Sequence, residues 1–289
     1  MYLPDFDYYA PDSVAEACEL LSQFGDSAKV LCGGTDLIPK MKHELIAPKV
    51  MVSIKKIPGL NKIQYVPGKG VVIGAASTHN DVVFSEVMQE KYLSVSNAAQ
   101  TMAANQVRHI GTVGGNIVSA VPSADMAPIL IALNASAVIV GPESERTLLL
   151  EDVFTGPSRT VLAKNEILTE IVIPDQEMTG STYFKFALRK AGALAVVGVA
   201  AAVQVEDDVI KDVRVALGAV APTPMRAIKT EEFLKGKKIT DELLEEAGKI
   251  ASTECKPITD FRASDEYRRD LVRVYVKRAL KRAIDKGHI

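Results

Sequence analysis

Two pairs of adjacent glycines are the residues of this chain best suited to hold a ligand. Gly33-Gly34 lies in the segment Leu31–Leu37, and Gly114-Gly115 lies in Thr112–Asn116. A diphosphate is bound by several main-chain N–H groups that converge on its oxygens, and glycine lets the backbone come that close or adopt a positive φ. The sequence therefore predicts one phosphate-binding site built from two turns that meet in the fold. Small polar neighbours can complete these turns or donate further hydrogen bonds: Thr35, Asp36, Thr112 and Asn116.

The spacing of these glycines differs from the two best-known nucleotide-binding patterns. Neither G-x-G-x-x-G nor a Gly-Lys-Ser/Thr loop occurs in the chain. Asp125, an acid in an apolar neighbourhood, suits two roles equally well: a carboxylate at a helix N-terminus, or an acceptor for ribose hydroxyls.

No side chains suited to covalent or metal catalysis stand out. The four histidines lie apart from any serine or cysteine motif, so no nucleophile–base pair is expected. Cys18, Cys32 and Cys255 are isolated, and we expect neither zinc nor an iron–sulfur cluster in this chain. Each cysteine is expected to be a small buried apolar residue, with Cys32 close enough to the first glycine pair to touch a ligand.

The composition is that of a globular protein. The 289 residues, 47% of them apolar, are enough for two domains. The net charge of −2, from 34 basic and 36 acidic residues, argues against binding to nucleic acid or to an anionic membrane surface. The N-terminus lacks the pattern of a secretion signal, and no apolar run is long enough to span a bilayer. We therefore expect a cytoplasmic protein that binds a small molecule or another protein.

The elements that must position the glycine pairs follow from apolar spacing and turn residues. Residues 13–24 have helical spacing, with Asp12 or Ser13 as N-cap and Gly25 as the stop. A short buried strand over 29–32 then leads into the first glycine pair, and a helix follows near 37–42. The same rules predict strands over 50–54, 71–74 and 137–140, and helical segments over 85–104 and 129–133.

A change of composition near Asp175–Gly180 marks the expected domain boundary. Beyond it, three apolar segments (182–188, 195–205 and 209–219) predict a three-stranded antiparallel sheet, and helices are predicted over 231–234, 241–252 and 265–286, with Thr240 as an N-cap. The chain is thus expected to be an α+β protein. Its N-terminal domain would span residues 1–176, with two α+β subdomains divided near 55–60, and its C-terminal domain would span 177–289.

Three motifs in this order resemble the FAD-binding medium subunits of molybdenum hydroxylases, a family that includes xanthine, carbon monoxide and nicotinate dehydrogenases. They are Cys32-Gly-Gly-Thr-Asp36, then Gln106-Val-Arg-His-Ile-Gly-Thr-Val-Gly-Gly-Asn116 with Pro122-Ser-Ala-Asp125, and Glu166-Ile-Leu-Thr-Glu-Ile-Val-Ile-Pro174. The resemblance covers nearly the whole chain. The segments 218–226 and 261–268 look most like bacterial xanthine dehydrogenase FAD-binding subunits.

The resemblance implies a fold and a cofactor. The N-terminal domain would be a two-subdomain FAD-binding domain of the PCMH/VAO type, followed by a three-stranded antiparallel sheet with a C-terminal helical bundle. The two glycine segments would hold the FAD diphosphate, Asp125 would contact the ribose or adenosine end, and Lys185 would lie against the FAD. If Lys185 is near N1 and the C2 carbonyl of the flavin, it would favour the anionic reduced form. The full set of implied FAD contacts is Val30, Leu31, Cys32, Gly33, Gly34, Thr35, Asp36, Leu37, Met102, Ile110, Thr112, Gly114, Gly115, Asn116, Ser119, Asp125, Ile167, Leu168 and Lys185.

The resemblance also implies partners. A large molybdopterin subunit would hydroxylate the substrate, with a purine such as xanthine as the first expectation. A small subunit would relay single electrons through two [2Fe–2S] clusters to the FAD of this chain, and NAD or another acceptor would take them up. The assembly would be a heterotrimer or its dimer. This chain itself would contribute no catalytic residue and no metal ligand.

Several relatives place an acid and then a tyrosine against the isoalloxazine, where this chain has Ala193 and Leu194. The contacts at that face are therefore left open, as are the substrate, the electron acceptor and the stoichiometry. Two alternative functions also remain at this stage. One is a stand-alone FAD-dependent oxidoreductase of the same FAD-fold superfamily, and the other is a non-catalytic nucleotide-binding protein whose glycines are only turns.

Overall fold

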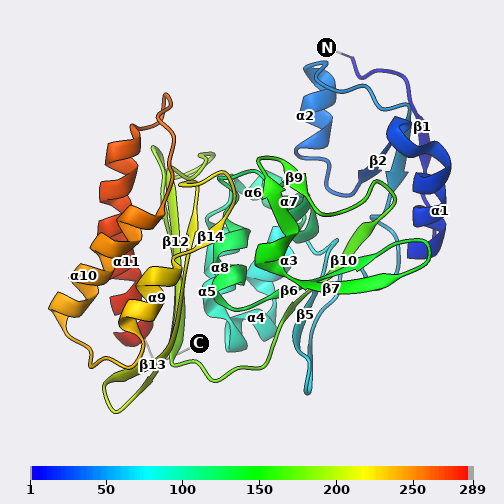
Figure 1. The fold of residues 1–289 in the computed structure, drawn as a ribbon. Helices are drawn as coiled ribbons and strands as arrows, with labels where there is room; N and C mark the ends of the chain where they lie inside the picture. The colour runs from blue at the N-terminus through cyan, green and yellow to red at the C-terminus, as the bar shows by residue number, and fades with distance from the viewer. Residues whose placement is uncertain (1, 286–289) are drawn as a thin grey trace.

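The N-terminal part of the chain is a small parallel sheet covered by a helix (Figure 1). The computed structural model describes residues 2–285, so the predicted limits at residues 1 and 286–289, including the predicted end of the last helix at Lys286, lie outside the described residues. The Ser13 hydroxyl caps the helix that covers the small sheet, and Gly25 ends that helix, as predicted. The sheet has the order β1 (Asp7–Tyr9), β3 (Val50–Ser53), β2 (Ala28–Leu31), and α1 (Val14–Phe24) packs on it.

A five-stranded antiparallel sheet forms the middle of the molecule. Its order is β4 (Ile63–Val66), β5 (Gly70–Gly74), β10 (Ile167–Ile173), β6 (Ser136–Val140), β7 (Glu145–Leu149). A short hairpin of β8 (Phe154–Gly156) and β9 (Arg159–Thr160) follows β7. Apolar residues of this sheet share one core with the helices between β5 and β6, except α6. These helices are α3 (His79–Phe84), α4 (Glu86–Lys91), α5 (Leu93–Gln100), α6 (Asn105–Arg108), α7 (Val113–Ser119) and α8 (Met126–Ala132).

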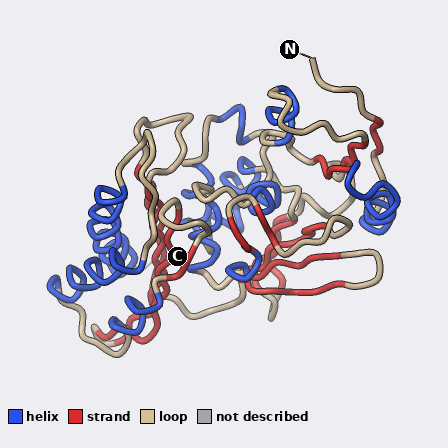
Figure 2. The backbone as a smooth tube through the Cα atoms, turned by 45° about the horizontal axis from the view of Figure 1, so that its top comes forward, coloured by secondary structure: helices blue, strands red, loops and turns tan. Residues whose placement is uncertain are grey.

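The C-terminal part is a second antiparallel sheet that lies between two layers of helices (Figures 1 and 2). The sheet has the order β11 (Gly180–Phe186), β12 (Val197–Glu206), β13 (Val209–Gly218), β14 (Met225–Arg226). Side chains alternate along β12: Ala200 and Ala202 face the core of α8, whereas Val199 and Val203 face the opposite helices. Those helices are α9 (Ile228–Leu234), α10 (Asp241–Glu254) and α11 (Asp265–Asp285).

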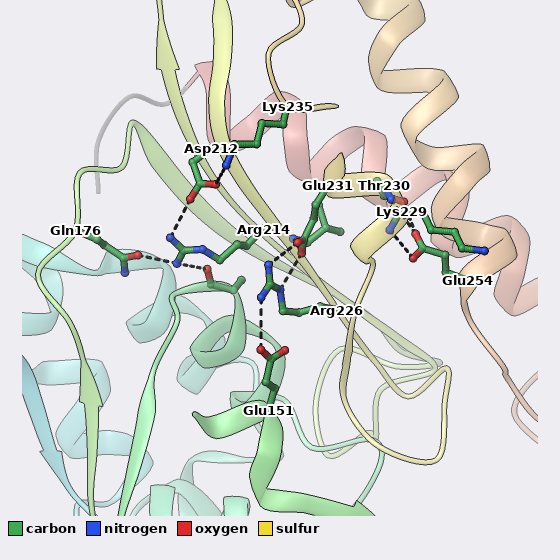
Figure 3. A network of polar contacts seen from close by, with 12 residues as sticks. Glu151, Gln176, Asp212, Arg214, Arg226, Lys229, Thr230, Glu231, Lys235 and Glu254 are labelled. Carbon is green, nitrogen blue, oxygen red and sulfur yellow. Dashed lines mark hydrogen bonds and ion pairs between the residues drawn. The ribbon is translucent and has the colours of Figure 1, made fainter. Parts of the chain in front are cut away.

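Arginines on β13 and β14 tie the C-terminal sheet to the middle of the molecule (Figure 3). Arg214 donates to the side-chain oxygen of Gln176 at 2.8 Å and is also paired with Asp212. Arg226 contacts Glu151 at 3.4 Å and Glu231 at 2.5 Å. Burial raises the pKa of Glu231, and the Arg226 guanidinium opposes that effect. The two arginines thus hold the C-terminal sheet against the middle of the molecule, and the candidate site draws residues from both.

The α+β prediction is confirmed, and its differences from the structure have local causes. The predicted helix over 85–104 breaks at Tyr92, whose φ of −142° is not helical and whose hydroxyl donates to the carbonyl of Pro174 at 3.1 Å. Strands β1, β4 and β7 were not predicted, because they are partly exposed and lack an apolar run. The two residues of β14 add a short fourth strand to the predicted three-stranded sheet.

Candidate functional site

The first glycine pair forms a tight turn between β2 and α2 (Leu37–Lys42), as predicted. Gly34 has a φ of +71°, which the absence of a Cβ makes accessible. The main-chain N–H groups of Gly34, Thr35 and Asp36 donate no hydrogen bond within residues 2–285. Three consecutive donors of this kind are free to receive an anionic oxygen.

The second glycine pair is helical, which corrects the expectation of a second turn. Thr112 caps α7, and its hydroxyl accepts the N–H of Gly115 at 3.1 Å. The N–H of Gly114 donates to the carbonyl of Ala75 at 2.9 Å. A Cβ on Gly114 would lie 2.6 Å from that same carbonyl oxygen. Gly114 therefore lets α7 pack against the end of β5, and the N–H groups of both glycines are already paired.

The two glycine segments meet in the fold, as the sequence predicts. A Cβ on Gly33 would lie 2.2 Å from the carbonyl oxygen of Ile110, so the two backbones are in direct contact. The Ser119 hydroxyl, on α7, donates to Oδ2 of Asp36 at 2.7 Å. Burial raises the pKa of the Cys32 thiol, and the hydroxyl of Thr112 beside it opposes that effect. The region from Cys32 to Asp36 thus faces the region from Ile110 to Ser119.

Three polar side chains around these segments hold buried atoms with no hydrogen-bond partner within the described residues: Ser77, His79 and Asn116. His79 is 1% exposed, and its pKa is lowered to about 4, mainly by burial and also by the charge of Arg108. Its imidazole is therefore neutral at physiological pH. Sequence reasoning selected Asn116 but passed over Ser77 and His79, because they belong to no glycine motif.

Asp125 and Lys185, both selected from the sequence, form a buried ion pair. Nζ of Lys185 lies 2.8 Å from Oδ2 of Asp125, and the two side chains are 8% and 7% exposed. Lys185 also donates to the carbonyl of Thr101 at 3.1 Å, and the Tyr183 hydroxyl donates to Oδ1 of Asp125 at 2.8 Å. Asp125 precedes α8 but makes no capping hydrogen bond, so its binding partners lie elsewhere. Tyr183 was not identified from the sequence.

Burial and the neighbouring side chains shift the pKa of Asp125 in opposite directions. Burial raises the pKa of Asp125, whereas the charge of Lys185 and the hydrogen bonds from Lys185 and Tyr183 lower it. The pKa of Tyr183 is raised well above its ordinary value by burial and by the Asp125 carboxylate. Tyr183 therefore acts as a neutral donor, and it helps to hold Asp125 in place.

The remaining predicted contacts divide between two cores. Ile167 is buried with β2 and α1, and Val30 and Cys32 pack against the same cluster. Leu168 points the other way, into the central core, against which Met102 also packs. Adjacent residues of a strand face opposite sides, so Ile167 and Leu168 do not line one surface together. Ile110 is 47% exposed, and Leu31, Leu37 and Ser119 are partly exposed around the first turn.

A loop over residues 187–194 follows β11, the strand that carries Lys185. The N–H of Gly192 donates to the carbonyl of Ala103 at 2.9 Å, and Arg189 donates to the carbonyl of Gly192 at 2.7 Å. Leu188 and Leu194 remain exposed. Ala193 and Leu194, whose contacts to the isoalloxazine were left open, therefore belong to a loop that Gly192 anchors to the middle of the molecule.

Within residues 2–285, no group of three or more His, Cys, Asp or Glu side chains is arranged to hold a metal ion. None of the helices in that part of the chain combines the length and the apolar character that a membrane crossing requires.

Two protein families match the chain in succession. Residues 4–176 match the family described as FAD binding domain in molybdopterin dehydrogenase. Residues 182–283 match the family described as CO dehydrogenase flavoprotein C-terminal domain. The first match includes both glycine segments and Asp125, and the second includes Tyr183 and Lys185.

Individual relatives are similar over almost their whole length. The carbon monoxide dehydrogenase medium chain of Hydrogenophaga pseudoflava is 37% identical, over 98% of both chains. The glyceraldehyde dehydrogenase medium chain of Sulfolobus acidocaldarius is 34% identical, over 97% of this chain and 99% of the relative. The xanthine dehydrogenase FAD-binding subunit of Escherichia coli O157:H7 is 29% identical, over 96% and 95%. A solved carbon monoxide dehydrogenase structure from Hydrogenophaga pseudoflava superimposes with a TM-score of 0.95 at 36% identity, over 100% of both chains.

Proposed function

The chain belongs to the FAD-binding medium subunits of the molybdenum hydroxylases, and we propose that it carries electrons out of an oxidoreductase complex through bound FAD. The proposal rests above all on the meeting of the two glycine segments. Gly33 abuts Ile110, and Asp36 is hydrogen-bonded to Ser119. Segments on opposite sides of the molecule could not grip a single dinucleotide.

We propose that the FAD diphosphate lies at the first glycine turn, at the unpaired N–H groups of Gly34, Thr35 and Asp36. Adjacent N–H dipoles stabilise an anion without a charged side chain. The buried side-chain amide oxygen (Oδ1) of Asn116 lacks a hydrogen-bond partner within residues 2–285, and it could accept a hydrogen bond from a sugar or ribityl hydroxyl. In this proposal Gly114 allows the close approach of α7 to Ala75, and the donors come from the first turn.

We assign the Lys185–Asp125 pair to the redox end of the cofactor. When bound, the flavin ring of FAD can take up electrons singly and release them in pairs. An ammonium group beside that ring stabilises the negative charge that reduction adds, and Asp125 and Thr101 hold the ammonium in position. We propose residues 1–176 as the FAD-binding domain and 177–289 as the C-terminal domain, a division that the two family matches support. The other predicted contacts remain proposals on the same basis: Val30, Leu31, Cys32, Leu37, Met102, Ile110, Thr112, Ser119, Ile167 and Leu168.

The partners follow from the family and from what this chain lacks. Its relatives are medium chains of carbon monoxide and glyceraldehyde dehydrogenases, names that imply further chains. We propose a large subunit with molybdopterin and a small subunit with [2Fe–2S] clusters, in a heterotrimer or its dimer, with NAD or another compound as acceptor. The three cysteines within the described residues are free, as is typical of a reducing compartment, and we propose a cytoplasmic location.

We propose a purine as the substrate class, because segments 218–226 and 261–268 look most like bacterial xanthine dehydrogenase FAD-binding subunits. The carbon monoxide dehydrogenase medium chain is 37% identical, compared with 29% for the xanthine dehydrogenase subunit. Oxidation of the substrate would occur on the large subunit, so residues of this chain do not select it.

Purification from the source organism tests the proposal. We expect a yellow protein that releases stoichiometric FAD on denaturation and that co-purifies with molybdenum and iron. A colourless protein with no FAD would contradict the proposal and favour a non-catalytic nucleotide-binding protein. FAD with independent turnover, and without molybdenum or iron, would instead identify a stand-alone oxidoreductase. Substrate oxidation by the intact complex, with xanthine and carbon monoxide offered separately, decides the substrate class.

A further inference from the structure

A groove of about 830 Å³ runs along the outer edge of strand β11. One wall is α5, with Leu93, Ser94 and Asn97, and the other is α11, with Tyr275 and Arg282. One end reaches Thr101 and Lys185 of the candidate FAD site, and the loop from Leu188 to Ala193 borders it there. At the other end of β11, Gly180 lies against α11, because a Cβ there would be 2.2 Å from the carbonyl oxygen of Ala283.

The floor of this groove is an open sheet edge. β11 is the first strand in the order β11-β12-β13-β14, and all seven of its residues pair with β12. Within residues 2–285, main-chain hydrogen bonds join β11 to no element on its other side. Lys185 is partly exposed and lines the groove. Unpaired N–H and C=O groups of an edge strand are a template for another strand.

All charged side chains that line the groove are positive. Lys185, Arg189, Lys190 and Arg282 line it, and no aspartate or glutamate does. Asp125 neutralises Lys185, which leaves three cations, all on exposed residues. The Arg282 guanidinium lies 5.3 Å from the ring centroid of Phe184. Such a surface attracts an acidic chain and repels a second copy of itself, since a copy would present the same cations.

We propose that this groove binds an extended acidic segment of a partner polypeptide, which adds to β11 as a further antiparallel or parallel strand. Main-chain hydrogen bonds to an edge strand supply affinity, and flanking side chains select the sequence. Arg189, Lys190 and Arg282 would pair with carboxylates of the segment. The inference rests on the proposed function, which supplies the partner chains. Because the groove begins at Lys185, the segment would bring its chain to the edge of the FAD site.

Charge reversal tests the groove in the native assembly, purified through an affinity tag on this chain. The test variant combines Lys190→Glu and Arg282→Glu, and it keeps Arg189 because that side chain donates to Gly192 in the loop beside the candidate FAD site. The control combines Lys56→Glu and Lys62→Glu, two exposed lysines for which the described residues form no ion pair. We expect the test variant to bind its partner chains at least about tenfold more weakly and to retain FAD. The control should behave as the wild type.

Hydrogen–deuterium exchange provides a second measurement that needs no variant. Residues 180–186 should exchange more slowly in the wild-type assembly than in the isolated FAD-loaded chain. Unchanged exchange there, or full partner binding by the groove variant, would overturn the inference and leave the proposed function intact. A self-dimer of the isolated chain that the groove variant abolishes would also overturn it, in favour of a second copy. If the wild-type chain binds FAD but no partner, both the proposed function and the inference fail.

Discussion

Nζ of Lys185 on β11 lies 2.8 Å from Oδ2 of Asp125, the residue before α8. Resemblance assigned these residues to different ends of the dinucleotide, Asp125 to the ribose or adenosine and Lys185 to the flavin. Because the two side chains are in direct contact, we propose that both lie at the flavin end of the cofactor. The pair also links the C-terminal sheet to the middle of the molecule, so the candidate site depends on both.

Breaking this pair should be costly. Lys185→Met or Asp125→Asn leaves the other group buried without its partner, and we expect a loss of about 3–5 kcal/mol in the free energy of unfolding. The double variant should lose less than the sum of the two single variants. Urea denaturation of the FAD-free chain measures each value. Lys281→Met, which removes the exposed pair with Asp241, is the control and should leave the free energy of unfolding nearly unchanged. Equal losses for Lys185→Met and Lys281→Met would show that the buried pair contributes little.

The contact between the glycine segments predicts a steric effect on cofactor binding. Gly33→Ala places a Cβ where the carbonyl oxygen of Ile110 lies, so the two segments must separate. We expect a fall of about tenfold or more in FAD affinity, measured by reconstitution of the FAD-free protein. Gly156→Ala is the control, because its Cβ would meet only Arg159, at 3.9 Å. Wild-type affinity in the Gly33 variant would separate the turn from FAD binding.

The arginine network of Figure 3 predicts unequal effects for two contacts of one side chain. Arg226→Leu leaves the carboxylate of Glu231, which is 8% exposed, without its main cation, and we expect a loss of about 3 kcal/mol in unfolding free energy. Glu151→Gln removes the longer and more exposed contact and should cost less than about 1 kcal/mol. Chemical denaturation of both variants checks the order, and a larger loss for Glu151→Gln would refute it.

Several site residues could be predicted from the sequence because glycine and apolar periodicity are local signals. Gly33 and Gly34 were placed correctly in a turn between strand and helix, and Thr240 and Ser13 were placed correctly as helix caps. Gly114 was wrongly placed in a turn, because the Ala75 backbone that it packs against lies far away in the sequence. Tyr183 and His79 were not identified, because their significance depends on the neighbours that tertiary structure gives them. The Ala75–His79 segment carries no motif of its own.

His79 predicts a specific acid sensitivity. Its pKa is about 4 in the folded chain and about 6.5 in an unfolded one, so only the unfolded chain binds its proton between these values. The stability that neutral His79 gives the folded chain is fully present above pH 6.5 and is lost as pH falls through about 4. The total loss in the free energy of unfolding is about 3 kcal/mol. His79→Gln should remove that part of the pH dependence, whereas His43→Gln, at an exposed position, should not. Parallel pH profiles for wild type and His79→Gln would contradict the prediction.

The buried environment of Cys32 affects how readily its thiol is oxidised beside a redox cofactor. Reduced flavins pass electrons to oxygen, and the peroxide that forms is consumed by thiolates far faster than by thiols. Burial raises the pKa of Cys32, as it does for Cys18 and Cys255, so little of any of them is ionised near neutral pH. The subunit thus works next to a source of oxidant with its sulfur atoms held in their least vulnerable form.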